Sequence, residues 1–170
     1  MNRKVMTRTK HISFSYMEFD KPADLEPDDL ELLKYARKAA ANAYAPYSEF
    51  KVGAAVRLEG GEIVTGTNVE NAAFPSGICA ERSALSNASS NYPGNTPVVL
   101  AVSAQIGGKT TADTVSPCGN CRQVIAEEEY RNKKPIKLIL DGRKKIFVVA
   151  RGADLLPIQF NRDNLKFSSR

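Results

Sequence analysis

The sequence predicts an α/β fold of three layers, in which helices cover both faces of a mixed β-sheet of about five strands. The first observation is that strand-like and helix-like segments follow one another in mixed order along the chain. The second is the length, because 170 residues with 42% hydrophobic content suffice for one compact domain but not for two. We therefore expect a single domain over residues 28–170, preceded by an N-terminal extension over residues 1–27.

The extension contains a segment with the pattern of a strand. Ile12, Phe14 and Tyr16 alternate with polar residues, which is the period of a half-buried strand that docks at a sheet edge or covers a neighbour. No apolar run of signal-peptide length follows the basic residues of the extension, and no stretch has the length and apolar character of a membrane span. We expect a soluble, cytoplasmic protein.

The first helix is expected from Pro27 to about Tyr44. Proline suits the first position of a helix, and the two aspartates that follow it complement the positive helix N-terminus. The Ala45-Pro46 step then ends the helix. Two strands follow, over residues 51–58 and 62–69, joined by a hairpin turn at Gly60-Gly61.

Asn68 and Glu70 stand at the end of the second strand. Two residues apart on an extended chain, their side chains point to the same side. An amide and a carboxylate together can hold a sugar diol, since one donates and the other accepts hydrogen bonds. The same spacing is equally typical of residues that cap a loop.

The second half of the chain continues the mixed order. Helices are expected from Cys79 to about Ser90 and after Pro117-Cys118-Gly119, and strands at 97–104, 136–140 and 146–149. Near the end, a short helix is expected around Asp154, followed by Phe160 as an aromatic anchor or as a core residue.

All cysteines of the chain stand in two short runs, Cys79-Ala80-Glu81 and Pro117-Cys118-Gly119-Asn120-Cys121. Catalytic zinc sites usually have three protein ligands and keep a fourth position for water, whereas structural sites close with four. Three cysteines fit the catalytic case, and the single histidine, His11, lies far from them in sequence. The spacing predicts one zinc ion per subunit, held by Cys79, Cys118 and Cys121.

Glu81 and Arg82 extend this chemistry. A carboxylate two residues after the first ligand reaches a metal-held water without binding the metal, and zinc deaminases use a glutamate in this position as general acid and base. Three thiolates around a divalent cation leave a net charge of about −1, which Arg82 could offset unless it is an ordinary arginine on a helix surface. Because both cysteine runs open helices, whose N-termini lower thiol pKa values, we also expect helix capping to favour the thiolates.

Other interpretations of these features stay open. A Cys-x-x-Cys pair can be a redox pair, and three cysteines can be unrelated buried thiols. The formal net charge of +5 is compatible with nucleic-acid binding. However, the basic run from Arg131 to Lys145 lacks the interleaved aromatic residues that stack on bases, so a solvated surface is the preferred interpretation and nucleic acid is not an expected partner.

Five short runs of the sequence resemble, in the same order along the chain, those of the small homotetrameric cytidine deaminases. The resemblance covers about residues 28–160. The resemblance implies the three-layer cytidine-deaminase-like fold and the hydrolytic deamination of cytidine and 2′-deoxycytidine to uridine and 2′-deoxyuridine, with release of ammonia, in pyrimidine salvage. The extension has no counterpart in the minimal pattern of the family. The runs are Ala43-Tyr44-Ala45-Pro46-Tyr47-Ser48-Glu49-Phe50-Lys51-Val52-Gly53-Ala54-Ala55, Asn68-Val69-Glu70-Asn71-Ala72, Cys79-Ala80-Glu81-Arg82, Pro117-Cys118-Gly119-Asn120-Cys121-Arg122-Gln123, and Leu155-Leu156-Pro157 with Phe160.

The resemblance also implies roles for single residues. The matching cysteines bind zinc, Glu81 carries protons to ring nitrogen 3 of cytosine and to the exocyclic amine, and Arg82 contacts the ligand thiolates. Phe160 is the aromatic residue expected to reach the pocket of a neighbouring subunit. The active sites of the implied homotetramer are therefore shared between subunits.

Substrate contacts follow from the same resemblance. Asn68 and Glu70 would hold the ribose, Phe50 would pack against the pyrimidine, and Ala80 would be a further contact. Three rival functions remain: deamination of another cytosine nucleoside such as blasticidin S, editing of polynucleotide cytosine, and a non-catalytic zinc module that holds RNA. The Asn68–Asn71 run favours the plain nucleoside, editors typically use histidine as the first ligand, and a zinc module needs no glutamate at position 81.

Overall fold

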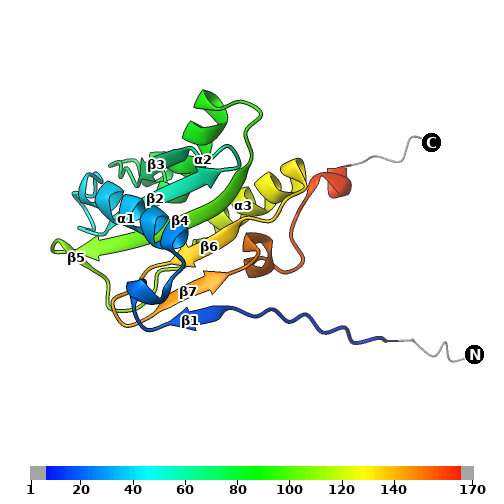
Figure 1. Ribbon diagram of the computed structural model, residues 1–170. Helices are drawn as coiled ribbons and strands as arrows, with labels where there is room; N and C mark the ends of the chain where they lie inside the picture. Colours follow the sequence, from blue (N-terminus) through cyan, green and yellow to red (C-terminus); the bar gives the residue numbers. More distant parts are fainter. Residues whose placement is uncertain (1–6, 166–170) are drawn as a thin grey trace, which may run out of the picture.

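The computed structural model describes residues 7–165, and its seven strands form one sheet with helices on both faces (Figure 1). The sheet order is β1-β7-β6-β4-β2-β3, with β5 paired to β4. β4 and β6 run parallel, whereas the other pairs are antiparallel. The three-layer α/β/α prediction is confirmed. The elements are β1 (Met17–Phe19), α1 (Pro27–Ala41), β2 (Lys51–Leu58), β3 (Ile63–Thr67), α2 (Ala80–Asn91), β4 (Pro97–Ile106), β5 (Lys109–Thr110), α3 (Gly119–Asn132), β6 (Lys137–Leu140) and β7 (Ile146–Val149).

The two faces of the sheet carry separate hydrophobic cores because side chains alternate along the strands. On β2, Ala54 and Val56 face α2 and α3, whereas Ala55 faces α1. Ile125 of α3 closes the first core and Leu33 of α1 the second, and both are completely buried. Apolar residues at successive positions of one strand are what a sheet covered on both faces requires.

The sheet has two strands more than predicted, and both are at its margins. β5 is a two-residue strand that folds back on β4. β1 lies at the edge beside β7, but over residues 17–19 rather than in the predicted 12–16 segment. That placement of the strand was wrong, because β7 ends at Val149 and offers no partner to residues before Tyr16. Ile12 and Phe14 are exposed in an extended arm, residues 7–16, which runs away from the sheet in Figure 1.

The connecting segments agree with the prediction in kind. α1 begins at Pro27 as expected but ends at Ala41, and Tyr44 forms an isolated bridge with Val69. The short helix expected near Asp154 is a 3₁₀ turn, Gly152–Leu155. Further 3₁₀ turns are Pro22–Asp24, Phe74–Ser76 and Arg162–Leu165. No helix within residues 7–165 has the length and apolar character that crossing a membrane requires.

Part of the predicted extension is tied to the sheet. β1 pairs with β7, and Lys145 beside β7 forms ion pairs with Glu18 and Asp20. The outer ends of the predicted segments 1–27 and 28–170, residues 1–6 and 166–170, lie outside the described residues. The division into extension and domain stays a prediction.

A buried charge supports the loop that leads into α3. Asp141, at the end of β6, is fully buried and accepts two hydrogen bonds of 2.7 Å from the guanidinium of Arg37 on α1. Ser103 of β4 donates a third, also of 2.7 Å. The backbone carbonyl of Asp141 accepts from Val115, two residues before Pro117. Contacts on the α1 face of the sheet therefore help to fix the loop that leads to the second cysteine run.

Candidate metal centre and nucleoside cavity

The three cysteines meet where α2 and α3 begin. Their Sγ atoms all lie within 4.8 Å of one another. The Cys79–Cys118 and Cys118–Cys121 sulfur separations are 3.9 Å and 3.6 Å. Sulfurs bound to one tetrahedral zinc at about 2.3 Å stand roughly 3.8 Å apart, so the donor set fits that ion. Among the described residues these three form the one candidate metal cluster, without histidine.

Helix starts bring the sulfurs together. Cys79 is the N-terminal cap residue of α2 and Cys118 that of α3, with Cys121 in the first turn. α2 can approach β3 closely because Gly66 has no side chain: a Cβ there would overlap the backbone of Ala84 and Ala80. Close packing of α2 on β3 thus holds Cys79, at the start of α2, next to Cys118 and Cys121 at the start of α3.

The pKa values of the three cysteine thiols shift in different directions. Burial opposes ionisation of Cys118, but backbone N–H groups of Cys121 and Asn120 and the neighbouring sulfurs lower its pKa. Burial and nearby negative groups raise the pKa values of Cys79 and Cys121. At these two cysteines burial therefore outweighs the effect expected of helix capping. Three crowded sulfurs repel as thiolates, and a divalent cation is the group that removes that penalty.

Glu81 lies in the first turn of α2 with only 5% of its surface exposed. Burial raises the pKa of Glu81, because a carboxylate loses its hydration there. A hydrogen bond with Cys121 partly opposes that shift. A buried carboxyl of this kind, beside a metal cluster, is suited to proton transfer.

The cysteine cluster borders a cavity of about 620 Å³. Seven of the predicted site residues line this cavity. Cys121 is buried beside it, next to the other two cysteines. The sequence did not point to the hydroxyl groups of Ser48 and Ser116 or to the aromatic rim formed by Tyr47 and Phe74, whose rings are 6.1 Å apart. Tyr47 and Ser48 do belong to a run that carries the resemblance. The seven are Phe50, Asn68, Glu70, Cys79, Ala80, Glu81 and Cys118.

Asn68 and Glu70 line the cavity and also bind the chain around β2. Asn68 Oδ1 accepts a hydrogen bond of 2.7 Å from Val52 N–H, and its Nδ2 donates one of 2.9 Å to the carbonyl of Phe50. Glu70 accepts from Ser48 and Tyr47. The loop-capping and ligand-binding interpretations are therefore compatible.

Comparison with known proteins agrees with this geometry. A sequence model described as the cytidine and deoxycytidylate deaminase zinc-binding region matches residues 26–134. Cytidine deaminase from Sporosarcina psychrophila is 38% identical over 140 residues, which cover 82% of this chain and 96% of that protein. The chain belongs to the cytidine deaminase family.

Two further relatives put this membership in context. The crystal structure of cytidine deaminase from Burkholderia pseudomallei has 38% sequence identity and a TM-score of 0.65, covering 76% of this chain and 97% of that one. Blasticidin-S deaminase from Bacillus cereus is 27% identical over 145 residues, which cover 84% of this chain and 99% of that protein. The match to cytidine deaminases thus extends over most of the chain.

Two predicted residues of this cytidine deaminase family member lie away from the cavity. Arg82 is half-buried on α2, and within residues 7–165 its side chain makes no hydrogen bond or ion pair. Phe160 is 58% exposed, and its carbonyl accepts a hydrogen bond of 2.8 Å from Gln123 on α3. Their roles stay predictions.

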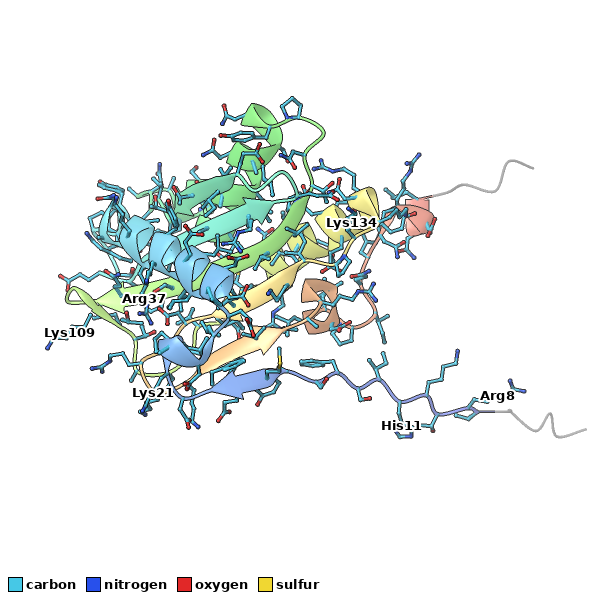
Figure 2. The ribbon with its side chains drawn as sticks, viewed as in Figure 1. Arg8, His11, Lys21, Arg37, Lys109 and Lys134 are labelled. Carbon is cyan, nitrogen blue, oxygen red and sulfur yellow. The ribbon has the colours of Figure 1, made fainter. Side chains whose placement is uncertain are left out.

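Labelled basic residues of the described structure lie on different sides of the molecule. Figure 2 shows Lys21 and Lys109 on one side of the molecule, Lys134 on the other, and His11 on the arm. Within the basic run, Lys134 pairs with Glu59 and Lys137 with Asp29. These contacts agree with the solvated surface preferred from the sequence.

Proposed function

We propose that the protein is a zinc-dependent enzyme that hydrolyses cytidine and 2′-deoxycytidine to uridine and 2′-deoxyuridine and releases ammonia. The observation that carries this proposal is the convergence of three Sγ atoms within 4.8 Å beside a cavity lined by Glu81. Pyrimidine salvage in the cytoplasm is the corresponding role. Free thiols arranged as metal ligands support a reducing compartment.

Cys79, Cys118 and Cys121 would hold one zinc ion in each subunit. When bound there, zinc would polarise a water molecule and lower its pKa from about 16 toward neutrality. Arg82 follows the proton carrier on α2 and is proposed to offset part of the negative charge of the three thiolates. The donor set supports zinc because three thiolates and an open position are typical of catalytic sites.

Glu81 is the proposed proton carrier. Its carboxylate accepts a proton from the attacking water and delivers one to ring nitrogen 3 of cytosine, which activates carbon 4. Once the oxygen of that water has added to carbon 4, the carboxylate takes the remaining proton from this oxygen and passes it to the exocyclic amine. The bond between carbon 4 and nitrogen then breaks, ammonia leaves, and the oxygen stays as the carbonyl of uridine. The burial of Glu81 supports this role, because a raised pKa brings proton exchange closer to neutral pH.

The remaining cavity residues are proposed to orient the nucleoside. Asn68 and Glu70 bind sugar hydroxyl groups, Phe50 packs on the pyrimidine ring and Ala80 contacts the base. The support is positional: all four line the same cavity as Glu81. One amide and one carboxylate provide the donor and the acceptor that a hydroxyl group needs.

The proposed assembly is a homotetramer with shared active sites, built from the domain over residues 28–170. Phe160 would enter the cavity of a neighbouring subunit. Its 58% exposure, and its absence from the lining of its own chain's cavity, support that role. The purpose of residues 1–27 is not part of this proposal.

Zinc content and turnover, measured on the same preparation, test the proposed function. We expect about one zinc per chain and loss of the cytidine absorbance band, with uridine and ammonia in equal amounts. Cytidine, 2′-deoxycytidine, blasticidin S and single-stranded polynucleotide should be compared as substrates. Preferred turnover of either of the last two would contradict the proposal, as would salt-dependent RNA binding without cytidine turnover.

A further inference from the structure

Glu70 is held by one tight turn, residues 47–50, between α1 and β2. Its Oε2 accepts two backbone hydrogen bonds, from Tyr47 N–H at 2.9 Å and from Ser48 N–H at 3.3 Å. Its Oε1 accepts the hydroxyl of Ser48 at 2.5 Å. Three donors from two adjacent residues thus fix the carboxylate of one half-buried residue.

The turn is also fixed from its far side. Phe50 N–H donates a hydrogen bond of 3.0 Å to Ser48 Oγ, so the hydroxyl accepts from the backbone and directs its proton to Glu70. Glu49, between these residues, has a φ of 57°, in the left-handed region that non-glycine residues rarely adopt. Strained backbone of this kind persists where surrounding contacts determine it, and it is found at ligand-binding sites.

We propose that Ser48 is a positioning residue for substrate recognition: it orients the Glu70 carboxylate so that one acceptor position faces the sugar of the bound nucleoside. This inference rests on the proposed function, because the sugar is the group that Glu70 would bind. It adds a residue that binds neither zinc nor the reacting base.

Counting hydrogen-bond positions shows what this arrangement leaves for a ligand. A carboxylate has about four acceptor positions, two on each oxygen. The backbone fills both on Oε2 and Ser48 fills one on Oε1, which leaves a single acceptor. Asn68 gives one N–H to Phe50 and keeps the other. One acceptor and one donor match a sugar hydroxyl, which both donates and accepts.

Removing the Ser48 hydroxyl should weaken this recognition without touching the chemistry. The carboxylate would keep only the two bonds on Oε2, and Oε1 could turn away from the sugar. The same hydroxyl is the largest cause of the lowered pKa of Glu70, so its loss also favours the neutral carboxyl. Glu81 and the cysteines make no hydrogen bond with Ser48, so the proton carrier and the metal ligands stay as they are.

Ser48→Ala tests the inference with two nucleosides. For cytidine we expect KM to rise about tenfold, the effect of losing a hydrogen bond to a charged group, while kcat stays within about twofold. 2′,3′-Dideoxycytidine lacks both ring hydroxyl groups, so its inhibition constant should change less than about twofold. Ser48→Thr keeps the hydroxyl and should restore the KM for cytidine.

Matched controls separate positioning from a structural role. Ser90→Ala makes the same chemical change on an exposed turn of α2 and should leave both constants unchanged. Equal weakening of cytidine and the dideoxynucleoside in Ser48→Ala, or an unchanged KM for cytidine, would overturn the inference but leave the proposed function intact. Wild-type protein that binds zinc but does not convert cytidine would overturn both.

Discussion

The metal centre and the N-terminal arm, residues 7–16, differ in what their side chains contact. Cys121 and Ala80 are completely buried, and Glu81 is 5% exposed. On the arm, Ile12 is 63% exposed and Phe14 47%, although their alternation resembles that of a strand. The difference teaches that apolar side chains at strand-like spacing become buried only where another element packs against them, as the sheet packs against α2 and α3.

The comparison has a functional consequence. Substitutions at the proposed metal centre should affect chemistry, metal content and stability together, because the proposed ligands also stand at the starts of core helices. Substitutions of the exposed residues Ile12 and Phe14 on the arm should change none of these in the isolated chain. The predictions below test this contrast, beginning with the largest expected effect.

Cys118→Ala should remove the metal and all measurable turnover. Two sulfurs hold zinc far less tightly than three, and metal binding contributes to folding stability, so the melting temperature should also fall. Metal analysis, the cytidine assay and thermal unfolding check this. Phe14→Ala on the arm is the control and should match the wild type in all three. If Cys118→Ala kept a full zinc content, the three-sulfur site would be wrong.

Glu81→Gln should separate metal binding from proton transfer. The amide has a similar shape but cannot carry protons, so kcat should fall by about 10⁴-fold while zinc content stays near one per chain. Steady-state kinetics on metal-analysed protein measure this. Near-native turnover by the fully zinc-loaded variant would rule out Glu81 as the proton carrier.

Leu138→Ala and Ile12→Ala compare the core and the arm by stability. Leu138 on β6 is fully buried, so its truncation should cost about 3 kcal/mol through lost burial and a cavity. Ile12→Ala should change the free energy of unfolding by less than about 0.5 kcal/mol, as exposed positions usually do. Urea denaturation compares the two. A cost of several kcal/mol for Ile12→Ala would show that the arm is packed in solution.

The smallest expected effect is a shift in one titration. Hydrogen bonds from Ser48 and Tyr47 lower the pKa of Glu70, so the carboxylate stays ionised below the ordinary glutamate range. Any stability that it contributes is present above that range and is lost as pH falls through the lowered value. Carbon-13 NMR of labelled glutamate measures the titration. Ser48→Ala should move it back upward, and an unchanged midpoint would contradict the hydrogen-bond assignment.

The sequence correctly predicts those elements whose starts depend on residues close together in the chain. Pro27 and the aspartates after it fixed the start of α1, and the cysteine runs fixed the starts of α2 and α3. The three-sulfur cluster followed from spacing because catalytic zinc has a small set of ligand arrangements. These features depend on a few neighbouring residues and one ion.

What escaped prediction depends on partners distant in sequence. The edge strand formed at residues 17–19 because β7 is short, which the alternation at Ile12 cannot reveal. The raised pKa values of Cys79 and Cys121 come from burial and mutual repulsion, which outweigh helix capping. The hold of Ser48 on Glu70 joins residues on two segments, and no local pattern encodes it.

X-ray absorption at the zinc edge of the purified protein tests the central claim most directly. We expect three sulfur neighbours at about 2.3 Å and one oxygen or nitrogen neighbour at about 2.0 Å. That shell would show a three-thiolate site with a position left for water or substrate. Four sulfur neighbours, or protein that takes up no zinc, would contradict the account.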